Sequence, residues 1–381
     1  MDNRIGILFL IDDFRGPEGG TEQHLLFLQR ELPRDRFRLC FAVLTRIQRM
    51  EATAFPVRPV MLANDCRGAG GIATRVRVLA SYLRAARIDV VHAFTRTSEV
   101  YGCLAVWLAG RGRVLGVRRN LGYWHTWRSR WAARAAGLLG ARYAANCEAA
   151  RAFATAVEWI PRRRISVVPN PIATSRLREG LAAVPSRESL GIRDGEPVVG
   201  IVASVRPVKD YATFLHAATR VLEKRPDTRF LAIGAEEVDY ARQMRTLASA
   251  LGIDGRLAWI GPVGNPYRLL PLMDVAVLSS RSEAFSNALL EYAAAGVATV
   301  ATDVGAAREI VEDGETGFLV PPGSPEVMSE RIVRLLSDAE LRRKFADQSR
   351  RRVHARFSQE VALAEYEQIY SELAGKTKGR P

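Results

Sequence analysis

The sequence alternates short apolar runs with stretches of helical periodicity, and it does so twice. In the first half, runs such as Ile5–Ile11 alternate with amphipathic segments such as Ile72–Ala86. Residues 172–197 then carry Pro, Gly and charged residues without a strong period, and the alternation restarts at Val198. A strand–helix alternation is typical of parallel sheets that are covered by helices on both faces. The chain is therefore predicted to fold into two doubly wound α/β domains.

The expected domain boundaries follow the breaks in this pattern. Residues 1–171 form the first domain, 172–197 a linker and 198–357 the second domain. Residues 358–381 hold a last helix, from Gln359 to about Leu373, and a tail that is expected to be disordered. We expect that helix to cross back to the first domain. Because doubly wound sheets bind ligands at the carboxyl ends of their strands, a ligand is expected in a cleft between the domains.

The expected strands are short and rich in Val, Ile and Leu, as buried parallel strands are. In the first domain they are Ile5–Ile11, Leu39–Leu44, Val57–Leu62, Asp89–Phe94, Arg113–Val117, Tyr143–Asn146 and a run near 165–168. In the second domain they are Val198–Val202, Arg229–Ile233, Leu257–Gly261, Val275–Leu278, Val297–Thr302 and Gly317–Val320.

Composition and charge narrow the expected cellular compartment and the expected binding partners of the protein. No apolar run reaches the ~18 residues that span a bilayer, and Asp12 and Asp13 follow the first apolar run too soon for a signal peptide. Four widely spaced cysteines favour a reduced cytoplasmic protein. The net charge is +14, and residues 110–165 hold twelve arginines against two glutamates. Such a segment favours an anionic partner, which could be a membrane surface, nucleic acid or a phosphorylated substrate.

A cluster of aromatic and basic residues lies inside that basic segment. The tryptophans share one face of a helix that is expected from about Trp127 to Leu139, and the arginines lie beside them; the candidates are Trp124, Trp127, Arg128, Arg130 and Trp131. Tryptophan together with arginine suits a lipid headgroup interface or an acceptor with phosphate and lipid groups. The alternative is an aromatic stripe that faces the core.

One stretch of the second domain combines a strand end with a helix start. The apolar run Val275–Leu278 is followed by a polar turn, and a helix is expected to open near Ser286. The unpaired N–H groups of a helix start can bind a phosphate. Glu283 before the helix and Glu291 inside it could accept hydrogen bonds from ligand hydroxyls. The alternative is a capped core helix with two solvated glutamates.

Two cations follow the first strand of the second domain. Arg206 and Lys209 lie where this strand gives way to a helix, and their planar and point-like charges together suit a diphosphate. In the first domain, the loop around Gly19 and Gly20 would let backbone approach a ligand, and Thr21 could cap the helix that follows. By themselves these features also fit two solvated cations and an ordinary tight turn.

Taken together and in order, these motifs resemble the retaining family-4 glycosyltransferases of the GT-B fold, which has two Rossmann-like domains. The residues that carry the resemblance are Gly19-Gly20-Thr21-Glu22, Val168-Pro169-Asn170, Arg206-x-x-Lys209, Gly261-Pro262-Val263, Glu283 to Glu291, Ala295 to Gly305, and Gly314 to Val320. The chain departs from the family pattern at Ala298, where relatives have Pro. It also departs at Arg118-Arg119-Asn120, where many relatives have a His.

The resemblance implies a donor site that binds a nucleotide-diphosphate sugar, a UDP-sugar foremost. Arg206 and Lys209 would bind the diphosphate, Glu291 the ribose and Glu283 the sugar hydroxyls. The remaining donor-binding groups would be backbone at Gly19, Gly20, Val263, Phe285, Ser286 and Asn287.

The resemblance also implies a mechanism without a metal or another cofactor. The chain has no D-x-D motif, and fixed cations with a helix start can stabilise the leaving diphosphate. In a retaining transfer the acceptor hydroxyl attacks the face that the diphosphate leaves. Glu283, Arg206 and Lys209 are the catalytic candidates on the donor side.

The acceptor side is less defined by the sequence. A glycan or lipid-linked glycan of cell-surface polysaccharide or glycolipid biosynthesis is the expected acceptor, with a peripheral contact to the inner face of the cytoplasmic membrane. His125 and His92 are the candidates for the proton-transfer group there, although a lone His is often structural.

Two other functions stay open at this stage. A sugar-nucleotide epimerase on the same fold would convert the donor without an acceptor. A nucleic-acid-binding protein is favoured by the charge alone, since no recognition motif for nucleic acid is present.

Overall fold

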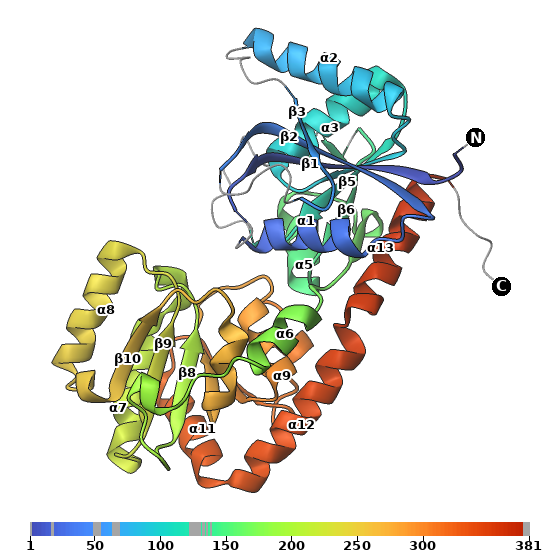
Figure 1. The fold of residues 1–381 in the computed structure, drawn as a ribbon. Helices are drawn as coiled ribbons and strands as arrows, with labels where there is room; N and C mark the ends of the chain where they lie inside the picture. The colour runs from blue at the N-terminus through green and yellow to red at the C-terminus, as the bar shows by residue number, and fades with distance from the viewer. Residues whose placement is uncertain are drawn as a thin grey trace. The chain divides into compact units, whose positions relative to one another are not determined.

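The structure is a computed structural model that describes residues 2–16, 19–48, 55–62, 69–121, 131, 134, 136–137 and 139–375. It divides into two compact units, which are shown in Figure 1. The N-terminal unit comprises Met1–Pro169 and Glu360–Pro381, and the C-terminal unit comprises Asn170–Gln359. Each unit is built around its own parallel sheet, which confirms the expected fold class.

The N-terminal unit has a seven-stranded sheet in the order β3-β2-β1-β4-β5-β6-β7. All neighbouring strands are parallel. The strands are β1 (Ile5–Phe14), β2 (Phe37–Ile47), β3 (Pro59–Met61), β4 (Val90–Ala93), β5 (Arg113–Arg118), β6 (Arg142–Ala145) and β7 (Ile165–Val167). The strand order reverses direction between β1 and β4, so the topological switch point of this sheet lies there.

Helices cover both faces of this sheet. They are α1 (Gly20–Glu31), α2 (Ala69–Ala85), α3 (Arg96–Ala109), α5 (Glu148–Val157) and α13 (Gln359–Leu373). Helix α3 packs closely on Leu10 and Val91, because a Cβ on Gly102 would lie 3.8 Å and 3.2 Å from their side chains. Helices α1 and α13 lie on the other face of the sheet (Figure 1), and their buried residues share one hydrophobic core with Phe9 of β1.

The last helix of the chain is an integral part of the N-terminal unit. Tyr366 and Tyr370 on α13 are fully buried, and their hydroxyls lie 2.8 Å from His24 Nε2 and His92 Nδ1. The core around them also contains Phe9, Phe37 and Ile369. This packing confirms that the C-terminal helix returns to the N-terminal domain.

The C-terminal unit has a six-stranded parallel sheet in the order β10-β9-β8-β11-β12-β13. The strands are β8 (Val198–Val202), β9 (Arg229–Ile233), β10 (Leu257–Gly261), β11 (Val275–Leu278), β12 (Ala298–Thr302) and β13 (Phe318–Val320). Its α-helices are α6 (Thr174–Leu181), α7 (Tyr211–Lys224), α8 (Val238–Ala250), α9 (Asn287–Ala295), α10 (Ala307–Ile310), α11 (Pro325–Ser337) and α12 (Ala339–Arg356). The central strands β8 and β11 are buried β-branched runs, as expected for strands with helices on both faces.

The prediction that residues 172–197 form a linker between the domains is wrong. The whole stretch belongs to the C-terminal unit, and it contains α6 and a 3₁₀ turn at Glu188–Leu190. Gly180 packs so closely that a Cβ there would lie 2.4 Å from the Cβ of Tyr267. The helix is short and mostly polar, so its periodicity was too weak to detect before its packing partner was known.

Two other expectations concern residues that the structure leaves out. Most of the expected helix from Trp127 to Leu139 and most of the C-terminal tail lie outside the described residues. Among the helices that the structure describes, none is both long enough and apolar enough to span a membrane.

Candidate functional site

Two loops of the C-terminal unit meet because their strands are neighbours. Strands β8 and β11 pair in parallel, so the loops after them leave the same edge of the sheet. Lys209 Nζ, after β8, forms an ion pair with Glu283 Oε1, after β11. Ser280 Oγ donates a second hydrogen bond to Glu283 Oε1, at 2.8 Å. The side chains of Lys209 and Glu283 are 13% and 14% exposed, so this pair remains open to a ligand.

The β8 loop is shaped by the buried Asp210. Asp210 adopts a left-handed conformation with φ 47° and caps α7. Its Oδ2 accepts hydrogen bonds from Thr213 Oγ1 at 2.8 Å and from Arg281 Nε at 3.0 Å. Ser279 Oγ donates to the Lys209 carbonyl at 2.8 Å. These contacts tie the β8 and β11 loops together and orient Lys209.

The β11 loop is also anchored from β12. Gly305 has φ 54°, and a Cβ there would lie 1.9 Å from the Glu283 carbonyl oxygen, so only glycine fits. The Ala306 N–H donates to the Ala284 carbonyl at 2.8 Å, and Thr302 Oγ1 donates to the Ser280 carbonyl at 2.7 Å. The carboxylate of Glu283 is therefore held on a rigid loop.

Helix α9 begins beside this loop. Ser286 is its N-cap and accepts a hydrogen bond from the Leu289 N–H at 3.3 Å. Phe285 is buried against Phe357, with ring centroids 5.9 Å apart, so it offers a ligand its backbone alone. Asn287 Oδ1 accepts a hydrogen bond of 2.7 Å from Asn170 Nδ2. The Val-Pro-Asn motif therefore contributes a residue that orients the start of α9.

Glu291 lies one turn into α9 and carries the most perturbed carboxyl group of this unit. Burial raises its pKa to about 7, against an opposing effect of Arg176. Within the described residues, no hydrogen bond or ion pair compensates its charge. A partly buried carboxylate without a partner is suited to accept hydrogen bonds from a ligand.

The loop that contains Val263 is held next to α6. Arg176 Nη2 donates to the Gly264 carbonyl at 2.7 Å, and Asn265 Nδ2 donates to the Arg176 carbonyl at 2.7 Å. Arg206, at the start of the 3₁₀ turn Pro207–Lys209, is exposed and has no carboxylate partner among the described residues. Arg206 and Lys209 thus differ, since Lys209 is already paired within the protein.

In the N-terminal unit, the glycine loop starts a helix. Gly19 is the N-cap of α1 and Gly20 its first residue, and the cap has no side-chain hydrogen bond. The expected capping role of Thr21 is therefore wrong, because Thr21 already lies inside the helix. The Glu22 carboxylate folds back toward the cap, since a Cβ on Gly19 would lie 2.1 Å from Glu22 Oε2.

The two histidine candidates have different outcomes. His92 is fully buried between Phe9, Phe94 and the tyrosines of α13, and burial together with Arg119 lowers its pKa to about 3. A neutral imidazole in the core does not reach an acceptor, so the catalytic interpretation of His92 is wrong. His125 lies outside the described residues, as do Trp124, Trp127, Arg128 and Arg130.

Trp131 is described, and it belongs to a surface cluster that the sequence analysis missed in part. The Arg134 guanidinium lies 4.7 Å from the centroid of the Trp131 ring and 3.0 Å from that of the Trp159 ring. Trp131 and Trp159 are 60% and 67% exposed. Trp131 therefore does not belong to a core stripe, and Trp159 was missed because it lies 28 residues further along the chain.

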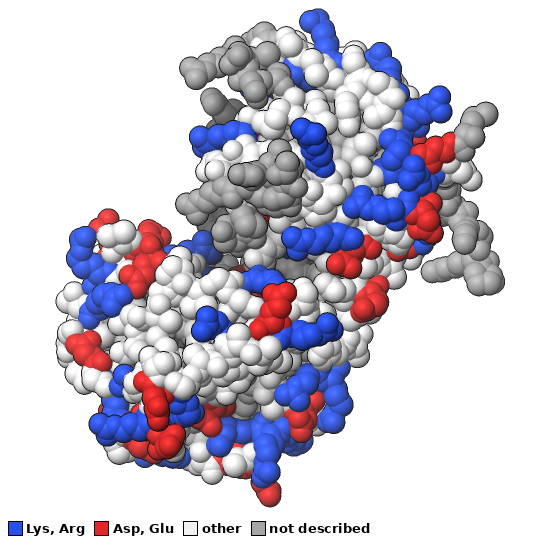
Figure 2. All heavy atoms as spheres, viewed as in Figure 1, with Lys and Arg blue, Asp and Glu red and all other residues white. Residues whose placement is uncertain are grey.

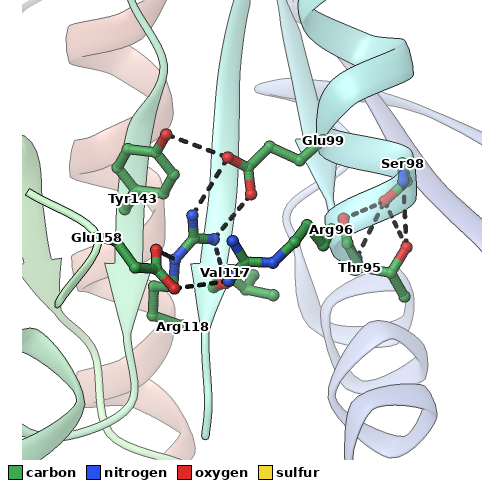
Figure 3. Close-up of polar contacts among 8 residues, drawn as sticks. All are labelled: Thr95, Arg96, Ser98, Glu99, Val117, Arg118, Tyr143 and Glu158. Carbon is green, nitrogen blue, oxygen red and sulfur yellow. Dashed lines mark hydrogen bonds and ion pairs between the residues drawn. The ribbon is translucent and has the colours of Figure 1, made fainter. Parts of the chain in front are cut away.

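A buried ionic network lies at the end of β5, and no sequence motif pointed to it (Figure 3). Arg118 donates to Glu99 Oε2 at 2.7 Å and to Glu158 Oε2 at 2.5 Å, and Arg96 Nη2 donates to Glu158 Oε1 at 2.6 Å. Tyr143 Oη donates to Glu99 at 3.1 Å. Although burial opposes it, the two glutamates raise the pKa of Arg118. The Arg118 guanidinium is therefore fully used in contacts within the protein. It is not accessible to a ligand, so it cannot take the place of the His that many relatives have here.

This network also changes the interpretation of the basic segment. Arg142 pairs with Glu372 at 2.9 Å, and Arg151 pairs with Glu148, so acids from several elements neutralise part of the segment's charge. On the face that Figure 2 shows, Lys and Arg are dispersed and mixed with Asp and Glu. The described residues on that face form no continuous basic track of the kind that nucleic acid binding requires.

Comparison with known proteins identifies two family models along the chain. The model "Glycosyl transferases group 1" matches residues 185–352, and "Glycosyltransferase Family 4" matches residues 18–176. Both descriptions are of glycosyltransferases, and neither is of an epimerase or a nucleic-acid-binding protein.

Relatives with curated names show the same similarity. The N-acetyl-alpha-D-glucosaminyl L-malate synthase of Bacillus anthracis is 28% identical over 187 residues, which are 49% of this chain and 48% of that protein. The putative glycosyltransferase EpsD of Bacillus subtilis is 32% identical over 185 residues, 49% and 48% of the two chains. The chain thus matches about half the length of these relatives.

Solved structures match over nearly the whole chain. HepE of Anabaena, solved in complex with UDP, has a TM-score of 0.82 at 21% identity and covers 97% of this chain and 100% of its own. A glycosyltransferase from Rickettsia africae has a TM-score of 0.86 at 17% identity, with 98% and 100% covered. At these identities the likeness establishes the fold.

Proposed function

Because the chain belongs to the family-4 glycosyltransferases of the GT-B fold, we propose that it transfers a sugar from a nucleotide-diphosphate sugar to a hydroxyl group. A UDP-sugar is the proposed donor, since structures of HepE contain UDP and UDP-glucose. The proposed acceptor is a glycan or lipid-linked glycan of cell-surface polysaccharide or glycolipid biosynthesis. The similarity to the capsular polysaccharide biosynthesis glycosyltransferase CapM of Staphylococcus aureus and to the lipopolysaccharide outer core galactosyltransferase WaaB supports this class.

The observation that carries the proposal is the polar site at the carboxyl ends of β8 and β11. Lys209 and Arg206 would bind the diphosphate, and the N–H groups around Ser286 would add to the positive field at the start of α9. Glu283, oriented by Lys209 and Ser280, would accept hydrogen bonds from the donor sugar. Glu291 would accept them from the ribose, and the backbone at Val263 would contact the base.

The same site suits a transfer without an enzyme nucleophile. Glu283 is paired with Lys209, and this pairing favours a role in binding over attack at the anomeric carbon. In the proposed step the acceptor oxygen bonds to the anomeric carbon as the bond to the diphosphate breaks. The acceptor proton moves to the leaving phosphate oxygen, on the same face of the sugar. Fixed cations stabilise the charge that develops on the diphosphate.

Nucleotide binding should depend on the ionisation of Glu291. Its pKa is raised to about 7, so the carboxylate that accepts ribose hydroxyls strongly is the minor form at pH 6 and the major form at pH 8. We expect UDP to bind about tenfold more tightly to the wild type at pH 8 than at pH 6 from this group alone. Calorimetric titration with UDP, GDP and ADP measures this and identifies the base.

The matched control is Glu291→Gln, which keeps the shape and removes the titration. Titration of the diphosphate of UDP affects both proteins equally and cancels in the ratio of wild-type to variant Kd. Because only the wild type has a titrating carboxyl group at position 291, this ratio should still change with pH. A ratio that is constant from pH 6 to 8 would remove Glu291 from the ribose site. If none of the three nucleotides bound to the wild type, the proposed function would fail.

We also propose that the N-terminal unit contacts an anionic membrane surface through Trp131, Arg134 and Trp159, at the inner face of the cytoplasmic membrane. Two exposed indoles with a guanidinium between them suit the headgroup region, where aromatic rings and cations are favoured. We expect Trp159→Ala to lower binding to vesicles of phosphatidylglycerol and phosphatidylcholine at least threefold at low salt, measured by co-sedimentation.

The control for this measurement is Trp107→Ala. Trp107 on α3 is 71% exposed and outside the cluster, so its removal deletes equal aromatic area elsewhere. Equal losses in the two variants, or no binding of the wild type, would contradict the proposed surface.

A further inference from the structure

A cavity of about 470 Å³ opens at the switch point of the N-terminal sheet. It is lined from the carboxyl ends of β1, β4 and β5 and from the start of α1, by residues that include Asp12, Glu22, Thr95, Arg96, Arg119 and Asn120. Ligands of doubly wound sheets bind at this position, where the chain connections diverge to opposite faces. All the residues that line the cavity belong to the N-terminal unit.

Most cations of the cavity are already neutralised. Arg96 and Arg118 share Glu158, and Arg118 also binds Glu99 (Figure 3). Arg15 lies 3.5 Å from Asp13. Arg119 differs from them, since none of the residues that the structure describes gives it a carboxylate partner. The hydrogen bond found for its guanidinium is a long one, 3.4 Å from Nη2 to the Gly20 carbonyl.

The surroundings of Arg119 make this unpaired charge unfavourable. The side chain is partly buried, and burial lowers its pKa. Burial and the charge of Arg119 lower the pKa values of the nearby His24 and His92. Both imidazoles are therefore neutral, and neither compensates the charge of Arg119. The guanidinium also lies at the first turn of α1, where the helix dipole is positive. A buried cation without a partner is costly, and a bound anion removes this cost.

We propose that Arg119 determines specificity in this cavity by binding an anionic group, a phosphate or a carboxylate, of a hydroxylated acceptor. The inference rests on the proposed glycosyl transfer and narrows its acceptor class. The Asp12 and Glu22 carboxylates at the cavity make no ion pair among the described residues and can accept hydrogen bonds from hydroxyls. The network of Arg118 fixes the end of β5 and thereby the neighbouring Arg119.

The test compares three sugars that differ in one substituent. Glucose 6-phosphate, glucuronic acid and glucose are titrated into the full-length wild type by calorimetry in 150 mM salt. At least one of the two anionic sugars should bind with an affinity at least about tenfold higher than that of glucose, as expected for a charge-assisted bidentate contact. Their relative affinities distinguish phosphate from carboxylate. Equal affinity of glucose, or no saturable binding of either anionic sugar, overturns the proposal.

Variants assign the selectivity to Arg119. Arg119→Met should abolish the preference for the anionic sugar, and Arg119→Lys should retain part of it. Arg163→Met, an exposed arginine of the 3₁₀ turn Arg162–Arg164 outside the cavity lining, should leave it unchanged. A preference that survives in Arg119→Met overturns the assignment.

The affinity for UDP separates this inference from the proposed function. UDP should bind Arg119→Met as it binds the wild type. If UDP binding is lost and the sugar preference is kept, Arg119 serves the donor and the proposal is wrong. If the wild type binds the anionic sugars and no nucleotide, the proposed function fails while the anion site stands.

Discussion

Replacing Arg118 with Met is expected to destabilise the N-terminal unit by about 3–5 kcal/mol. Arg118 is 6% exposed and is held by Glu99 and Glu158, which are 2% and 1% exposed. Without the guanidinium, two carboxylates remain buried, with Arg96 as the cation still bonded to one of them. Five of the six tryptophans belong to this unit, so their fluorescence during urea unfolding reports its stability.

Two comparisons show whether the loss comes from uncompensated charge. Arg111→Met breaks the surface pair of Arg111 with Asp89, whose cation is 41% exposed, and should cost no more than about 1 kcal/mol. The triple variant Arg118→Met, Glu99→Gln, Glu158→Gln removes all three charges and should recover part of the loss. A cost below about 1 kcal/mol for Arg118→Met would contradict a buried network.

Replacing Lys209 with Met is expected to lower kcat/KM for glycosyl transfer about 100- to 1,000-fold, the loss typical of removing one group that stabilises transition-state charge. Lys209 is a partly buried cation that forms an ion pair with Glu283, on the loop that precedes α9. Its loss would remove positive charge from the diphosphate site and leave the Glu283 carboxylate without its ion pair. Steady-state rates with sugar donors of the nucleotide that binds in the calorimetric titrations provide the measurement.

The matched variant is Lys224→Met, which removes an exposed lysine at the end of α7 and should retain full activity. Glu283→Gln keeps Lys209 and tests the sugar contact, so it should raise KM for the donor sugar more than Kd for UDP. Activity of Lys209→Met within twofold of the wild type would show that the lysine only supports the loop.

The strands and helices of the C-terminal unit were predictable because their signals are local. Buried β-branched runs define β8 and β11, Ser286 caps α9, and Gly296 with φ 71° ends it. The motifs that carry the family resemblance lie at the ends of these same strands. Both the parallel sheets and the candidate donor residues could therefore be read from short stretches of sequence.

The environment of His92 and the structure of residues 172–197 were predicted less well, because the residues that pack against them are distant in the sequence. His92 looked like a candidate acid or base because it ends a strand, yet it is bonded to Tyr370, 278 residues away, on a helix that returns to the core. The linker looked unstructured because α6 gains its stability from Tyr267 and the loop around it. The local pattern of hydrophobic residues around His92 or α6 does not indicate that Tyr370 or Tyr267 packs there.

By itself, the sequence determined the two parallel sheets, the glycosyltransferase motifs and the positions of Arg206, Lys209, Glu283 and Glu291 at strand ends. The tertiary structure alone decided which charges are compensated. Lys209 meets Glu283 across 74 residues, and Arg118 meets Glu99 and Glu158 across 19 and 40. Propensity and periodicity act over a few residues, whereas electrostatic compensation depends on distances in space. For that reason Arg119, which has no carboxylate partner among the described residues, became a candidate for ligand recognition only once the chain was folded.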